Sequence, residues 1–258
     1  MNLFVLLKTV PDTVEELTVA ADNKSLDAEW LRFKLSDADE HALEQALLLK
    51  EKHGGTVTVV AMDAPELDES LFMAFAKGAD RVAKLTGELA GVQSFSAARL
   101  FAEFLKPAGQ ALPPDTLILL RSQAMDDLEG EIGPYLADFL GLPYVGVVTS
   151  VQPNGTGVTL TKEFAGGLRG EFSCPMPAVL GIQSAEKPPR YVPIAKVRAA
   201  MKASKLETVD VTPADDPARF PIDRMYKPES AGRAEMLEGS PEEVADRLVE
   251  LLANQSLI

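Results

Sequence analysis

The sequence predicts an α/β fold: a doubly wound, mostly parallel sheet with an added antiparallel hairpin and a C-terminal extension. Three observations support this class. Short apolar runs alternate with amphipathic stretches four times along residues 2–148. Two alternating runs then flank Ala165-Gly166-Gly167, as in a hairpin whose turn needs positive φ. Finally, a polar, proline-rich stretch separates residue 205 from one last amphipathic segment.

The parallel sheet is expected to start with residues 2–8, an apolar run typical of a central strand that is buried on both faces. Residues 9–12 break this strand, and two alternating pieces within 17–35 predict a small hairpin around a turn at 22–24. Further strands are expected at 56–62, 81–85, 116–120 and 143–148, with helices at 36–52, 63–78, 92–106 and 132–140.

The next segments are predicted to extend this sheet. Residues 158–162 and 168–172 alternate in polarity and form the two arms of the hairpin, and residues 178–182 are an apolar strand. A basic, proline-rich loop at 187–194 leads into a helix that carries Lys196, Arg198 and Lys202.

Two parts of the chain are expected. Residues 1–205 read as a nucleotide-binding-like α/β domain, and residues 206–258 as an extended tail with a terminal helix. That helix begins with a capping box at residues 240–243, with proline at its first position. Its apolar face must be buried, either on its own domain or on a partner chain.

The composition of the chain excludes some classes of binding partner. The net charge of −14 argues against nucleic acid or an anionic membrane surface. No segment resembles a signal sequence and no apolar run reaches about 18 residues, which favours a cytoplasmic protein, or an organelle-matrix protein after processing. Two histidines and one cysteine without ligand spacing predict no metal site.

A ligand crevice is expected at the carboxyl ends of the parallel strands, where residues 8–12, 36–39, 62–65 and 121–131 form loops. G-x-G-x-x-G, Walker and G-x-S-x-G motifs are absent. Asp126-Asp127 is the one paired carboxylate in the crevice, either a solvated helix start or an acid/base pair. A crevice without catalytic residues suits a protein whose cofactor only passes electrons.

Several short segments follow one another in the order found in a known family. They are VLLKTVPD at 5–12, DEHALEQA at 39–46, AKGADR at 76–81, QAMDD at 123–127, KEFAGG at 162–167 with PMPAV at 175–179, and PPRY at 188–191. Together they resemble the β-subunit family of electron-transfer flavoproteins over nearly the whole chain. The family usually has an acidic residue directly before Gly-Gly, where this chain has Ala165.

This resemblance implies an electron carrier rather than an enzyme. Such β-subunits pair with a larger α-subunit that holds most of the FAD, and their C-terminal tail docks on it. The flavin takes electrons from partner dehydrogenases and passes them to an acceptor such as a quinone reductase. The β-subunit usually binds AMP, or a second FAD in electron-bifurcating members. The alternative is a nucleotide-binding regulatory module without electron transfer.

The resemblance also implies site residues. The cofactor-binding positions are Leu6, Ser36, Asp37, Ala38, Asp39, Met62, Arg121, Ser122, Gln123, Ala124, Met125, Asp126, Asp127, Gly130, Glu131 and Ile132. The loop that docks partner dehydrogenases would use Arg190, Tyr191 and Ile194.

Three departures from the family pattern bear on the nucleotide. Ala38 replaces an aromatic residue, Arg121 replaces a glycine, and residues 128–132 replace the Asp-x-Asn-x-Thr end of the phosphate loop. Glu129 or Glu131 would place a carboxylate where the phosphate charge should sit. Two outcomes stay open: Arg121 partners a bound phosphate and offsets the acids, or the acids stand in for the phosphate and Arg121 fills or neutralises the empty site.

Overall fold

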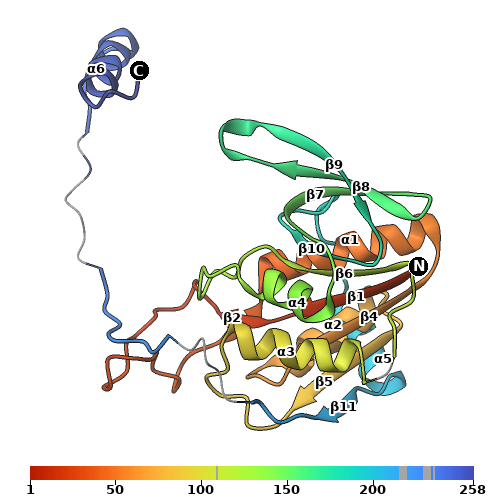
Figure 1. Ribbon diagram of the computed structural model, residues 1–258. Coiled ribbons are helices and arrows are strands. Elements are labelled where there is room, and N and C mark those ends of the chain that lie inside the picture. The colour runs from red at the N-terminus through yellow and green to blue at the C-terminus, as the bar shows by residue number, and fades with distance from the viewer. Residues whose placement is uncertain (109, 215–219, 229–233, 235) are drawn as a thin grey trace.

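The computed structural model describes residues 1–108, 110–214, 220–228, 234 and 236–258 (Figure 1). Its main sheet has nine strands in the order β11-β5-β4-β1-β6-β10-β7-β8-β9. These strands are β1 (Asn2–Leu7), β4 (Thr56–Met62), β5 (Arg81–Thr86), β6 (Thr116–Arg121), β7 (Tyr144–Asn154), β8 (Gly157–Glu163), β9 (Arg169–Pro175), β10 (Ala178–Ile182) and β11 (Glu207–Asp210). The helices are α1 (Asp37–His53), α2 (Leu67–Lys77), α3 (Ser94–Leu105), α4 (Ile132–Leu140), α5 (Ile194–Ala203) and α6 (Pro241–Asn254).

The central strands run parallel, and the direction of the winding reverses beside β1. The chain moves outward from β1 to β4 and β5, then returns to β6 on the other side of β1. Strand β10 inserts between β6 and β7 and is parallel to both. The carboxyl ends of β1 and β6 therefore flank the switch point at which ligands bind in such sheets.

Helices cover both faces of the sheet, as the continuous apolar strands require. Leu3, Val5 and Leu7 of β1 pack into one core with α1 and α2, whereas Leu6 packs into the other core with α3 and α4. The predicted doubly wound, mostly parallel sheet is thereby confirmed.

The hairpin predicted at 158–172 is confirmed, since β8 pairs antiparallel with β9. Gly166 and Gly167 lie in the short 3-10 turn η1 (Ala165–Gly167), with φ of 74° and 76°. These are the left-handed angles that favour glycine. Strand β7 runs on to Asn154 and pairs with β8, so the hairpin continues the main sheet beyond the parallel strands.

The excursion after β1 differs from the prediction. Residues expected to break the first strand form β2 (Thr9–Pro11), which pairs antiparallel with β3 (Phe33–Leu35). The hairpin predicted within 17–35 is reduced to one bridge between Val19 and Leu26. Burial explains the difference, because Val10 and Leu35 are buried whereas the 17–19 piece stays partly exposed.

The C-terminal region begins with a strand that the sequence analysis did not predict. Residues read as the start of an extended tail form β11, which pairs in parallel with β5 at the sheet edge. Further along the predicted tail, 215–219, 229–233 and 235 lie outside the described residues.

The predicted capping box is present at the start of α6, where Ser240 and Glu243 form reciprocal hydrogen bonds. Figure 1 shows α6 standing apart from the sheet. Among the described helices, none combines the length and apolar character needed to cross a membrane.

Candidate functional site

A cavity of about 750 Å³ opens at the switch point between the carboxyl ends of β1 and β6. Three of the loops predicted to form the crevice meet here, contributing Lys8, Met62, Arg121 and the 126–129 segment to its wall. The N-terminal end of α3 and a piece of the C-terminal region, residues 220–222, complete the lining.

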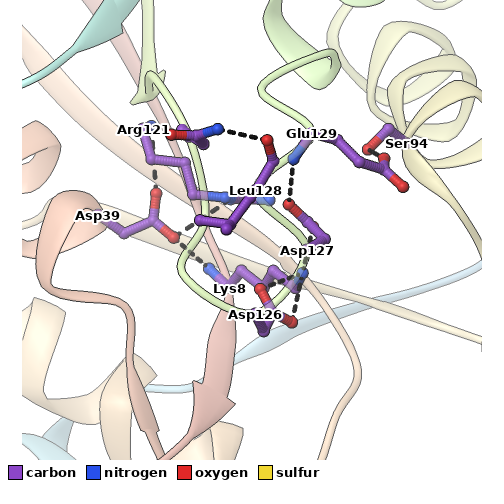
Figure 2. A network of polar contacts seen from close by, with 9 residues as sticks. Lys8, Asp39, Ser94, Arg121, Asp126, Asp127, Leu128 and Glu129 are labelled. Carbon is purple, nitrogen blue, oxygen red and sulfur yellow. Dashed lines mark hydrogen bonds and ion pairs between the residues drawn. The ribbon is translucent and has the colours of Figure 1, made fainter. Parts of the chain in front are cut away.

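Asp39 joins the two strands below the cavity. It sits in the first turn of α1, is fully buried, and accepts hydrogen bonds from the backbone N–H groups of Lys8 (2.8 Å) and Arg121 (3.2 Å). Burial raises the pKa of this carboxyl, and the Arg121 guanidinium opposes the rise. The carboxylate thus bonds the ends of β1 and β6 to each other (Figure 2).

Arg121 lies on the floor of the cavity and is 6% exposed. Its Nη1 donates to Asp39 Oδ2 at 3.2 Å, forming a buried ion pair. The Nε atom is enclosed and has no hydrogen-bond partner among the described residues. The positive charge of Arg121 is therefore already paired within the chain.

The loop between β6 and α4 is held over Lys8. The ammonium group of Lys8 lies 2.7 Å from a carboxylate oxygen of Asp126 and 2.8 Å from one of Asp127 (Figure 2). Asp127 also accepts the backbone N–H of Glu129 at 3.1 Å. The solvated-helix-start interpretation of Asp126-Asp127 is wrong, because α4 begins only at Ile132.

Two residues at the start of α3 belong to the site and were missed by the sequence analysis. Ser94 Oγ donates to Glu129 Oε2 at 2.6 Å, which fixes that carboxylate at the cavity wall. The side-chain amide of Gln93 both donates to the backbone carbonyl of Phe220 (2.8 Å) and accepts its N–H (2.9 Å). No local motif marks these contacts, because their partners are 35 and 127 residues away.

The structure brings only part of the expected set to the cavity. Those that line it are Met62, Arg121, Asp126, Asp127 and Ile132. The other expected positions do not line it: Leu6, Ser36, Asp37, Ala38, Asp39, Ser122, Gln123, Ala124, Met125, Gly130 and Glu131. Some of these support the wall instead; the Gln123 amide, for example, bonds to the Leu128 carbonyl and shapes the loop.

The predicted docking residues lie just before α5 and, with Ile194, at its first position. Tyr191 and Ile194 are 85% and 67% exposed, so both present apolar surface to solvent. Arg190 instead faces α1, where it donates to both carboxylate oxygens of Glu44 and to Glu51. This hydrogen bonding lowers the pKa of Glu51. Arg190 thus holds the loop to the domain, while its neighbours remain accessible.

A doubly wound sheet with a crevice at its switch point defines a class of α/β proteins that bind nucleotides or related cofactors. Within the described residues, no group of three or more histidine, cysteine, aspartate or glutamate side chains is placed to hold a metal ion. The site is built from the buried Arg121–Asp39 ion pair, the partly exposed cluster of Lys8 with Asp126 and Asp127, and a polar loop.

Comparison with known proteins identifies the family. The model of the electron transfer flavoprotein domain matches residues 27–216. The chain is 28% identical to electron transfer flavoprotein subunit beta of Bacillus subtilis, with all of each chain covered. It is 29% identical to the Methylophilus methylotrophus subunit beta over 98% of each chain, and 31% identical to that of Clostridium acetobutylicum over 81% of this chain and 79% of that one. The chain belongs to the electron transfer flavoprotein family, on its β-subunit side.

Proposed function

We propose that the chain is the β-subunit of a heterodimeric electron-transfer flavoprotein, which passes electrons from dehydrogenases to a downstream acceptor. The observation that carries this proposal is the end-to-end match to proteins named as this subunit. The regulatory alternative is not favoured, because none of the reported relatives carries such a name.

The α-subunit is the partner that the proposal requires. None of the residues of α6 is buried against the described part of the chain, and its leucines at 248, 251 and 252 are 39–47% exposed. An amphipathic helix is stabilised when it packs its apolar face on another surface. In this proposal residues 1–205 are the nucleotide-binding-like domain, and 206–258, with β11 added to the sheet edge, are the extension that docks on the α-subunit.

FAD, held mainly by the α-subunit, supplies the one- and two-electron chemistry when bound. The contribution of this chain is to hold a fixed surface beside the FAD. The floor of that surface is formed by the ends of β1 and β6, which Asp39 joins by hydrogen bonds. The exposed Tyr191 and Ile194 suit a surface that partner dehydrogenases recognise. The subunit would act as an electron carrier in the cytoplasm, with a quinone reductase or another protein as acceptor.

Co-expression with the α-subunit tests the proposal. The two chains should co-purify as a yellow heterodimer with one FAD, and a partner dehydrogenase should reduce that flavin in stopped-flow absorbance measurements. A colourless chain that forms a stable dimer with itself and ignores the α-subunit would reject it.

A further inference from the structure

The crevice of a β-subunit is where the family resemblance places AMP, so the charges around it decide whether a phosphate group fits. Four carboxylates line the cavity, from Asp63, Asp126, Asp127 and Glu129. Three cations line it as well, from Lys8, Lys24 and Arg121. Asp63 is also paired with Lys84 at 3.3 Å, so the charges around the cavity nearly cancel, and a phosphate monoester would add about two negative charges at pH 7.

Two of the three cations are committed to carboxylates of the chain itself. Lys8 is bound by Asp126 and Asp127 together, both within 2.8 Å. Arg121 is bound by Asp39, and its side chain is only 6% exposed on the cavity floor. A phosphate that bound either cation would leave its carboxylate partner unpaired. The free-energy cost would be larger for Asp39, which is buried, than for Asp126 or Asp127.

One backbone amide of the loop, that of Glu129, is used in the same way. Free N–H groups are what normally hold a phosphate at the start of a helix. Here the N–H of Glu129 already donates to Asp127, and the Glu129 carboxylate is fixed at the cavity wall by Ser94. At Glu129 the loop therefore presents an anion to the cavity, where a phosphate-binding loop would present a donor.

We infer that this crevice carries a built-in substitute for the nucleotide phosphate and rejects AMP, with Glu129 and Arg121 as the residues that decide the selectivity. The residues present do not fit a phosphate group. Glu129 supplies the repelling charge, and the Arg121–Asp39 pair fills the floor. This inference rests on the proposed function, since that function is the reason to expect AMP here.

The test measures AMP in two ways on the purified heterodimer. An extract of the denatured protein, separated by HPLC, should contain FAD and no AMP. Isothermal titration calorimetry with added AMP should detect binding at least about tenfold tighter in Glu129→Gln than in the wild type, equivalent to about 1.4 kcal/mol. Glu129 is exposed at the surface of the loop, so this variant should fold normally.

Glu103→Gln is the matched control, because it removes the same charge from an exposed side chain of α3 that does not line the cavity. Its AMP affinity should stay at the wild-type value. One AMP per wild-type heterodimer would overturn the inference, as would equal AMP binding by the wild type and Glu129→Gln. An equal gain in both variants would also overturn it, because Glu129 would then have no special role. Flavin reduction by a dehydrogenase, measured on the same samples, reports separately on the proposed function.

Discussion

At the scale of single residues, the site depends on pairs that are distant in sequence. Lys8 meets Asp126 and Asp127 across more than 110 positions, and Asp39 meets Arg121 across 82. The sequence allowed these positions to be predicted as members of one crevice, because all follow strand ends or open a helix. It could not show that they neutralise one another, since pairing depends on side-chain geometry. Nor could it single out Ser94, an ordinary serine at a helix start.

Asp39→Ala should strongly destabilise the fold. Removing the carboxylate leaves Arg121 buried without its charge partner, and such a loss typically costs about 3–5 kcal/mol. Urea unfolding followed by circular dichroism measures the change. Glu103→Ala breaks the exposed Arg99–Glu103 pair and should cost less than about 0.5 kcal/mol. Similar costs for the two variants would contradict the role assigned to the buried pair.

Asp80 should make stability depend on acid pH. Burial raises the pKa of this carboxyl, but hydrogen bonds from Lys50 Nζ (2.6 Å) and the N–H of Val57 (2.7 Å) outweigh it, so the pKa lies below 3.8. Its stabilising contribution is therefore full above 3.8 and is lost as the pH falls through the folded-state pKa. Asp80→Asn should flatten the loss of melting temperature that sets in as the pH falls below about 3.8. An unchanged slope would contradict the assignment.

At the scale of elements, periodicity predicted every strand and helix that is buried in the sheet or against it. It failed for strands that form only because a neighbouring strand is available to pair with them. Residues 9–11 contain a proline and look like a break, yet they pair with β3 because that arrangement buries Val10 and Leu35. Strand β11 is polar and short, and only the free edge of β5 makes it a strand.

The piece of chain at 220–222 should loosen when Gln93 is replaced. The Gln93 amide makes both hydrogen bonds to the backbone of Phe220, so Gln93→Leu removes them while keeping a side chain of similar size. Trypsin cleavage after Arg224, followed by mass spectrometry, should become faster. Gln110→Leu, an exposed glutamine in a loop, is the control and should cleave at the wild-type rate.

At the scale of the whole molecule, the domain and α6 differ in how they are stabilised. The domain buries two apolar cores on either side of its sheet, whereas α6 keeps its leucines exposed. The sequence analysis expected such a division from a helix that follows a polar tail, but it placed the boundary before β11, which joins the main sheet. The apolar periodicity of a helix does not show which surface covers its apolar face.

Truncation after residue 236 should therefore separate folding from assembly. The melting temperature of the isolated chain should change by less than about 2 °C, because α6 buries no residue in the domain. Gel filtration with the α-subunit should show that the truncated chain no longer forms the heterodimer. A large drop in melting temperature would mean that α6 packs on its own domain.

The position of β10 has a consequence for synthesis on the ribosome. Its residues come late in the chain, yet they fill the space between β6 and β7 in the middle of the sheet. Until residue 182 has left the exit tunnel, β6 keeps an unpaired edge of apolar backbone, which is prone to associate with other chains. Nascent chains stalled between β7 and β10 should therefore be the form of this protein that chaperones bind most strongly.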